Sequence, residues 1–202
     1  MYRAIRGTYI YACDSNLRNY LKKHISTFVS KNEIININTE LRILPIEDVK
    51  PYINAVPLLD IYAAASNFST LQVQAEYHNY TWVELPMTFS AREGYFVCKI
   101  LGESMNKVIA NGSMCLFKAD SGGSRNGKIV LVEHYDFQDS DFGSGYTVKE
   151  YHSEKEASEE GWMHKSITLT PKSYDSNYND IVLSGEELEH LKVVGIFIDI
   201  IG

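Results

Sequence analysis

A serine and a lysine in this chain have surroundings that suit nucleophilic catalysis. Ser104 lies in Gly102-Glu103-Ser104-Met105, directly after an apolar run, and Lys149 lies further along in Tyr146-Thr147-Val148-Lys149-Glu150-Tyr151. A serine hydroxyl is a poor nucleophile at neutral pH and needs an adjacent base, which can be a lysine held neutral in a desolvated site. Lysine titrates near 10.4, so lowering its pKa by about 3 units requires roughly 4 kcal/mol, which burial beside apolar neighbours can supply.

The strand pattern around Lys149 predicts that the side chain of Glu150 points away from the lysine. In an extended segment from Thr147 to Tyr151, successive side chains alternate, so Glu150 lies on the opposite face and does not hold the lysine charged. Each half of the pair also has an ordinary structural explanation, because such a serine is often a turn residue or N-cap and such a lysine often faces solvent. A triad of Ser104 with His134 or His152 also stays open, because triads assemble in space.

The order of the surrounding turns and strands strengthens the catalytic interpretation of Ser104 and Lys149. Asn111-Gly112 and Asn126-Gly127 are turn signals that each lead into an apolar strand, and Lys149 lies on the following strand. This order resembles the self-cleaving peptidase domain of the LexA and UmuD family from about Val56 to Gly202. The elements that carry the resemblance are Val56-Pro57-Leu58-Leu59, Ala63-Ala64-Ala65, Phe96 to Met105, Asn111-Gly112-Ser113, Arg125-Asn126-Gly127-Lys128, Thr147-Val148-Lys149 and Val193-Val194-Gly195-Ile196-Phe197.

The resemblance implies a role for each site residue. It makes Ser104 the nucleophile and Lys149 the general base, with the backbone amides of Glu103 and Ser104 as the oxyanion hole, and it requires no cofactor or metal. It places self-cleavage at Ala64-Ala65, where the family has glycine as the second residue. Alanine lacks the freedom of glycine at positive φ, so it can slow or prevent cleavage. A short helical or linker stretch is the alternative explanation of this alanine run.

The resemblance also implies partners and a cellular role. Members of the family usually cleave their own linker, are stimulated by a recombinase filament on single-stranded DNA and act in the DNA-damage (SOS) response. It further implies a homodimer. The apolar terminal strand from Val193 to Ile201 could support dimerisation by edge pairing, and an ordinary core strand is the alternative.

The expected fold is mainly β, the LexA/UmuD-like peptidase fold of short twisted strands, preceded by a small strand-helix segment. We expect that segment over 1–50, a linker with the cleavage segment over 51–70, and the peptidase domain over 71–202. A connector is predicted from Pro45 to Pro57, and a solvated loop from His152 to Gly161. The predicted strands are Phe96 to Leu101, Met114 to Lys118, Lys128 to His134, Tyr146 to His152, Ile167 to Pro171 and Leu191 to Ile201.

The first residues carry a second, shorter resemblance, covering about 25 residues. The run from Arg3 to Tyr11 resembles the last motif and final strand of a superfamily-one helicase, although Tyr2 stands where that motif has Thr or Ser. An amphipathic strand and helix that pack on the peptidase domain explain the segment at least as well. The run from Gly122 to Lys128 has the spacing of a phosphate-binding loop. However, Ile129 replaces the Ser or Thr that would hold magnesium and a strand follows, so we reject an ATP site.

Composition and charge exclude several classes of function. The hydrophobic fraction of 45% and aromatic fraction of 12% are ordinary for a globular chain, and the net charge of −7 argues against a broad nucleic-acid surface. One good helix before the linker argues against direct sequence-specific DNA binding by a helix-turn-helix repressor. Without an apolar run of roughly 18 residues or a signal-peptide core, we expect a cytoplasmic protein with no membrane contact. A membrane signal peptidase is disfavoured for the same reason.

The remaining chemistry-bearing residues predict structural roles. Cys13, Cys98 and Cys115 are an odd number of cysteines in apolar surroundings, so we expect reduced core thiols. The six histidines show no metal-ligand spacing. Two hypotheses follow. The chain is a serine-lysine peptidase that cuts its own linker, or it is a catalytically silent LexA-like interaction and dimerisation module attached to a DNA helicase. An intact chain after long alkaline incubation would favour the second hypothesis.

Overall fold

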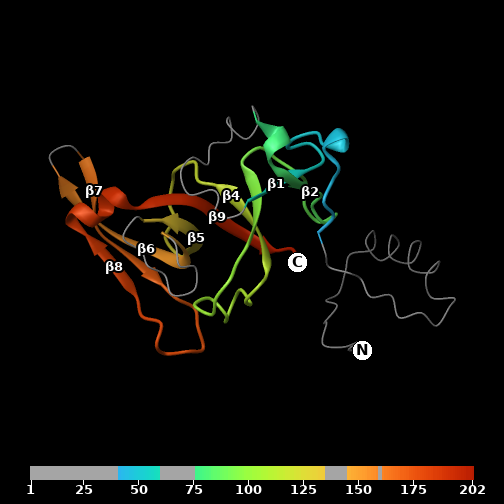
Figure 1. The fold of residues 1–202 in the computed structure, drawn as a ribbon. Helices are drawn as coiled ribbons and strands as arrows, with labels where there is room; N and C mark the ends of the chain where they lie inside the picture. Colours follow the sequence, from blue (N-terminus) through green and yellow to red (C-terminus); the bar gives the residue numbers. More distant parts are fainter. Residues whose placement is uncertain (1–40, 60–75, 135–144, 159–160) are drawn as a thin grey trace, which may run out of the picture. The chain divides into compact units, whose positions relative to one another are not determined.

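The computed structural model describes residues 41–59, 76–134, 145–158 and 161–202, which all lie within one compact unit, Thr39–Gly202. These residues are mainly β, as expected (Figure 1). The short 3-10 helices are η1 (Ile46–Asp48), η2 (Tyr77–Asn79) and η3 (Gly185–His190). The strands are β1 (Val56–Leu59), β2 (Thr81–Val83), β3 (Tyr95–Lys99), β4 (Met114–Ala119), β5 (Lys128–Glu133), β6 (Tyr146–Ser158), β7 (Gly161–Thr170), β8 (Ile181–Ser184) and β9 (Lys192–Ile200).

The strands form one sheet in the order β2-β1-β3-β4-β9-β5-β6-β7-β8. β1 runs parallel to β3, and the other neighbouring pairs are antiparallel. The late strand β9 therefore joins two halves of the sheet, one built from β1 to β4 and the other from β5 to β8. Figure 1 shows β9 passing between β4 and β5. The nucleophile candidate follows β3 in the first half, and the base candidate lies on β6 in the second half.

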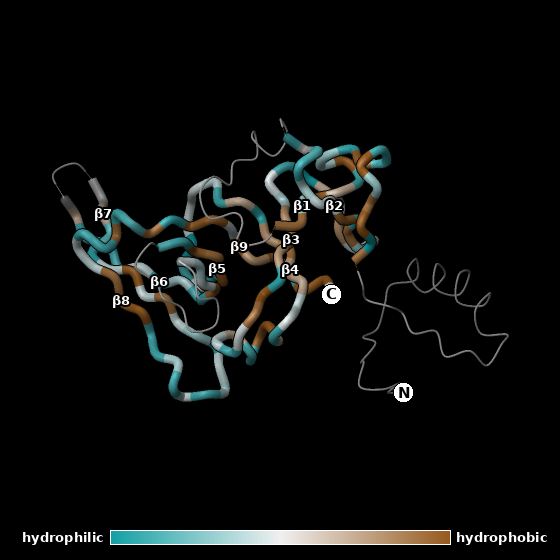
Figure 2. Tube along the Cα trace, in the orientation of Figure 1, coloured by the Kyte–Doolittle hydropathy of each residue, from teal (hydrophilic) through white to brown (hydrophobic). Residues whose placement is uncertain are grey.

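The central strands are continuously apolar because both of their faces are covered. In β3, Phe96 and Cys98 belong to one buried cluster, whereas Val97 between them belongs to another. β4 repeats the arrangement, with Leu116 facing the second cluster. Two-sided burial removes the polar positions that an open sheet face would carry. Figure 2 accordingly shows brown along β3 and β4, and teal in the loop between β7 and β8.

Gly195 allows β9 to pack closely against β3. A Cβ atom at this position would lie 2.7 Å from Cζ of Phe96 and 3.2 Å from the carbonyl oxygen of Lys118. The Phe96 ring is fully buried and stacks on Phe117 with centroids 5.5 Å apart, so it has little room to move. Glycine is therefore required here by close approach between side chain and backbone.

The six predicted strands all exist. The prediction of a loop from His152 to Gly161 was wrong, and the predicted connector from Pro45 to Pro57 is packed into the core. The run from Pro45 to Pro57 contains η1 and the start of β1, and Val49, Tyr52 and Ala55 within it are buried against Trp82. β6 continues to Ser158 and pairs with β7 through the region predicted as a loop. Charged side chains do not prevent a strand here, because this part of the hairpin is exposed and its hydrogen bonds come from the partner strand. β2 and β8 were not predicted.

The terminal strand is not an open sheet edge in its middle. Val193, Gly195 and Ile196 pair with β5, and the segment from Gly195 to Ile200 pairs with β4. Gly195 and Ile196, in the middle of the strand, thus have partners on both sides, which removes edge pairing at these positions as a route to a dimer. The reason is topological, since β9 enters between the two halves of the sheet.

Several expectations concern residues outside the described ranges. They are the Ala64-Ala65 cleavage site, the helicase-like run from Arg3 to Tyr11 and Cys13. In the described part, Cys98 and Cys115 are buried free thiols. No helix among the described residues has the length and apolar character needed to span a membrane.

Candidate active site

Ser104 lies on a loop that is closed at its base by strand-like pairing. The amide of Ile100, just after β3, donates to the carbonyl of Ser113 at 2.9 Å, and the amide of Gly112 donates to the carbonyl of Ile100 at 2.8 Å. We call residues 101–113 the nucleophile loop. Gly102 has φ of +100°, which favours glycine, and its amide donates to Asn111 Oδ1 at 3.0 Å. The Gly-x-Ser and Asn-Gly signals in the sequence therefore belong to one loop.

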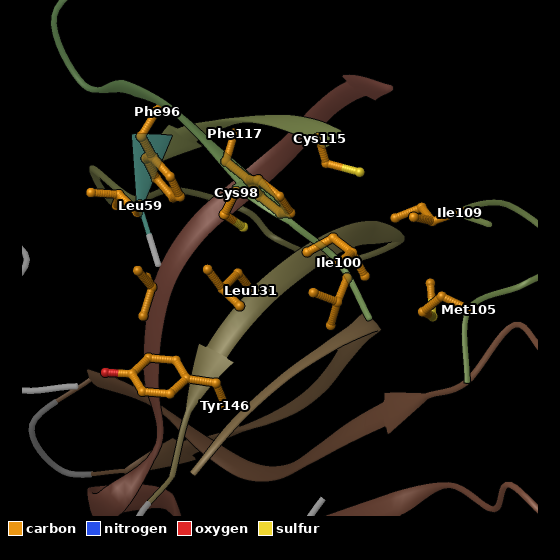
Figure 3. Close-up of a cluster of buried hydrophobic side chains, with 12 residues drawn as sticks. Leu59, Phe96, Cys98, Ile100, Met105, Ile109, Cys115, Phe117, Leu131 and Tyr146 are labelled. Carbon is orange, nitrogen blue, oxygen red and sulfur yellow. The ribbon is translucent and has the colours of Figure 1, made fainter. Parts of the chain in front are cut away.

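Two apolar side chains anchor this loop from within. The amides of Val108 and Ile109 both donate to the carbonyl of Met105 at 2.8 Å, which forms a single helical turn after the serine. Met105 and Ile109 are 2% and 1% exposed and join the buried cluster beneath β3 and β4. Figure 3 shows both side chains lying beside Ile100. Ser104 is thus placed next to a fixed core residue.

Lys149 reaches Ser104 from β6. Lys149 is the cross-strand partner of Val130 in β5, and its Nζ lies 2.9 Å from Ser104 Oγ. It also donates to Thr147 Oγ1 at 2.6 Å and to the Val148 carbonyl at 3.1 Å. The structure therefore brings together the two residues that the sequence paired.

The pair is buried and surrounded by uncharged oxygens in these contacts. Ser104 is 4% exposed, Lys149 is 3% exposed and Thr147 is fully buried. Burial disfavours a charged ammonium. A neutral amine has two N–H donors and one lone pair, which suffices to donate to Thr147 and Val148 and to accept the Ser104 hydroxyl proton. The geometry is compatible with proton transfer from Ser104 Oγ to Lys149 Nζ.

Glu150 makes its contacts away from the pair, as the strand alternation predicts. Its Oε1 lies 2.7 Å from His152 Nε2 and 3.0 Å from Lys172 Nζ. The hydrogen bond from His152 and then that from Lys172 lower the pKa of the Glu150 carboxyl. Glu150 is therefore ionised at neutral pH, and its charge is directed to these two groups.

A segment that follows β7 supports the nucleophile loop, and its polar run after Pro171 did not predict this role. The amide of Lys172 donates to the Ser104 carbonyl at 2.9 Å, and the amide of Lys107 donates to the Lys172 carbonyl at 2.8 Å. The amide of Tyr174 donates to Asn106 Oδ1 at 2.9 Å. Thr147 was also missed, although it lies two residues before Lys149, and side chains at i and i+2 share a strand face.

The histidines that could have formed a triad have other neighbours. His134 Nε2 lies 3.1 Å from the Glu187 carbonyl, and His152 faces Glu150. Across the described ranges, no group of three or more His, Cys, Asp and Glu side chains is arranged to hold a metal ion. The glycine-rich run ending at Lys128 leads directly into β5 and does not open a helix. The oxyanion-hole role of the Glu103 and Ser104 amides stays a prediction.

A comparison with protein families relates this chain to a known family of peptidases. The family model described as Peptidase S24-like matches residues 57–198, which is more than half of the chain. The chain belongs to the Peptidase S24-like family. This match confirms the LexA/UmuD-like resemblance and the mainly β peptidase fold, and it does not extend to the helicase-like N-terminal run. No curated protein matches the chain.

The matched range of the Peptidase S24-like domain contains both candidate site residues. It begins at the second residue of β1 and ends within β9, so it includes the strands that carry the nucleophile loop and Lys149. Family membership comes from the sequence pattern over this range, and the Ser104–Lys149 contact is a feature of the site's geometry.

Proposed function

We propose that this protein is a serine-lysine peptidase in which Ser104 is the nucleophile and Lys149 is the general base. The observation that carries the proposal is the 2.9 Å contact between Ser104 Oγ and Lys149 Nζ in a buried site. A buried lysine without charge can act as a base, and a serine beside it can act as a nucleophile. Membership of the Peptidase S24-like family supports the same reaction class.

The reaction proceeds in two acyl-transfer steps. Lys149 Nζ takes the proton of Ser104 Oγ as this oxygen bonds to the scissile carbonyl carbon, and the resulting oxyanion is bound by the Glu103 and Ser104 amides. Lys149 then gives the proton to the departing amine as the C–N bond breaks. A water molecule attacks the acyl ester, again with Lys149 as base, which releases a carboxylate and restores Ser104.

The proposed substrate is the chain's own segment around Ala64-Ala65. β1 runs parallel to β3 with Leu59 opposite Cys98, so the chain leaves β1 in the same direction in which β3 leads to Ser104. Ala64 is only five positions after Leu59, and an extended chain spans at most about 3.3–3.6 Å per residue. From Cys98 to Ser104 the distance along the chain is similar, six residues. Cleavage within one molecule is therefore within reach.

A catalytically silent module attached to a DNA helicase is the second candidate. The observation that favours it is Ala65, which stands where the family has glycine after the scissile bond. In that case the dyad would be intact, but the linker would be a poor substrate. Homodimerisation, stimulation by a recombinase filament on single-stranded DNA, a role in the SOS response and a cytoplasmic location extend the first proposal.

The test is intact mass after incubation between pH 7 and 10. We expect a cut at Ala64-Ala65 that rises with pH and is lost in Ser104→Ala and Lys149→Ala. Lys118→Ala, on exposed β4 surface, is the matched control for loss of a lysine. Cleavage that persists in Ser104→Ala contradicts the proposal.

A second measurement separates a poor substrate from an absent active site. Ala65→Gly restores the residue expected after the scissile bond, and a fluorophosphonate reports whether Ser104 is nucleophilic without any cleavage. Labelling of Ser104 together with an uncut wild type and a cut Ala65→Gly chain identifies the linker as the limiting part. If Ser104 is unlabelled and Ala65→Gly is also uncut, the dyad itself is inactive, which contradicts the peptidase proposal.

A further inference from the structure

One ion pair links the strand that carries Lys149 to the segment that holds Ser104. Glu150 follows Lys149 directly in β6, and its carboxylate lies 3.0 Å from Lys172 Nζ. Lys172 in turn donates its backbone amide to the Ser104 carbonyl and accepts from the Lys107 amide. The side chain of Lys172 therefore contacts β6, while its backbone contacts the nucleophile loop at Ser104 and, within the helical turn, at Lys107.

The strand register explains why the two charged groups meet. Glu150 is opposite Thr170 at the end of β7, and Lys172 comes two residues later. Residues two apart in an extended segment share a face, so Lys172 is a diagonal neighbour of Glu150. Lys149 projects on the other face of β6, toward Ser104. The ion pair is thus behind the site, and neither charged group reaches the reacting atoms.

We propose that the Glu150–Lys172 pair positions the site by fixing the distance between Ser104 Oγ and Lys149 Nζ. This inference rests on the proposed function. Ser104 and Lys149 come from different halves of the sheet, so their separation depends on contacts that connect the nucleophile loop to β6. The pair supplies such a contact one residue from the base and through the residue that binds the nucleophile's own carbonyl.

The Glu150–Lys172 pair is less exposed to solvent, and so better restrained, than an ordinary surface ion pair. Its side chains are 21% exposed for Glu150 and 35% for Lys172, whereas the Arg42–Glu84 pair has 70% and 45%. Glu150 also accepts from His152, which restrains the carboxylate further. Exposed pairs contribute little to stability because both side chains are solvated and mobile. A positioning role does not need a large contribution to stability. It needs only to restrain the two segments relative to each other, because small misplacements of reacting groups reduce rates strongly.

The experiment compares Glu150→Gln, Lys172→Met and the charge-reversed double variant Glu150→Lys/Lys172→Glu. Glu84→Gln is the matched control, because it removes one carboxylate of an ion pair on another part of the sheet. We expect the rate of Ser104 labelling or self-cleavage to fall about threefold to tenfold in each single variant. The double variant should recover to within about twofold of wild type. Unchanged rates in both single variants overturn the proposal.

A titration of Lys149 separates positioning from a simple effect of charge, and it requires no activity. The lysine Cε resonances are followed by NMR against pH, with Lys149→Arg to assign the signal. Removing the Glu150 charge alone favours neutral Lys149 and lowers its titration midpoint, whereas removing the Lys172 charge raises it. Loss of a positioning contact admits water in both variants, so both midpoints should rise toward that of free lysine. A lower midpoint in Glu150→Gln overturns the proposal.

These readouts also keep the two proposals apart. If wild type neither cleaves nor labels at Ser104, the proposed peptidase function fails, while the Lys149 titration still decides the positioning role. If wild type is active and the single variants match it in rate and midpoint, the positioning role fails alone.

Discussion

Replacing Thr147 with valine is expected to lower both the maximal rate of Ser104 acylation and the pH at which the rate reaches half of that maximum. Thr147 is fully buried and its Oγ1 accepts from Lys149 Nζ at 2.6 Å. Valine keeps the shape of threonine and removes the acceptor. The change therefore addresses one hydrogen bond to the base and leaves the strand and its packing in place.

The size of the effect follows from the charge that Lys149 would gain in the proposed reaction. A hydrogen bond between neutral groups contributes about 0.5–1.5 kcal/mol, and one to a charged group about 1.5–3 kcal/mol. The Thr147 bond is therefore stronger by about 1 kcal/mol once Lys149 has taken the serine proton. Its loss should reduce the maximal rate roughly fivefold. The same difference corresponds to a fall of about 0.7 pH unit in the midpoint, because the protonated form loses more than the neutral form.

The assay is the rate of fluorophosphonate labelling of Ser104 from pH 6 to 11, with Thr147→Ser as the control that keeps a hydroxyl. Thr147→Ser should stay close to wild type in both rate and midpoint. A Thr147→Val profile that coincides with wild type refutes the role of this hydrogen bond. If Thr147→Ser is impaired as strongly as Thr147→Val, the threonine acts through the packing of its methyl group.

Two further predictions concern the core. Gly195→Ala should lower the free energy of unfolding by about 1–3 kcal/mol in urea titrations, because its Cβ would lie 2.7 Å from the Phe96 ring; the double variant with Phe96→Leu should recover part of the loss, and an additive loss would contradict this explanation. Burial raises the pKa of Cys115 to about 12 and that of Cys98 well above its usual value. At pH 8 both are thus neutral thiols, and peptide-level mass spectrometry should find iodoacetamide adducts on them only after denaturation, so rapid labelling of the native protein would be evidence against this burial.

The parts of the fold that sequence predicted are those with short-range signals. The strands around Cys98, Cys115 and Val130 are apolar runs, and the last two each follow an Asn-Gly turn. Turn chemistry and hydrophobic pattern act over a few residues. β2 has three residues and β8 has four, so neither contains enough alternation to be distinguished from a loop. The extension of β6 to Ser158 was missed because its strand character depends on pairing with β7 and not on its own composition.

The candidate site also has features that the sequence could predict and features that it could not. The pairing of Ser104 with Lys149 came from the family resemblance, and the spacing of the two residues alone left a histidine partner open. The position of Thr147 was available from the two-residue period of a strand, since the residue type and its distance from Lys149 are both visible in the sequence. The contact between Lys172 and Ser104 was not available, because it joins residues that are far apart in sequence and depends on the path of the loop after β7.

The central place of β9 has a consequence for the order of events during synthesis. The half of the sheet that carries Ser104 and the half that carries Lys149 are joined within the sheet by a strand that begins only at Lys192. A ribosome therefore releases both halves before it releases the strand that aligns them. A nascent chain that lacks β9 has the proposed scissile segment, Ser104 and Lys149, but it lacks the strand that joins the two halves of the sheet. In the proposed peptidase, self-cleavage would thereby be postponed until β9 has been translated and inserted.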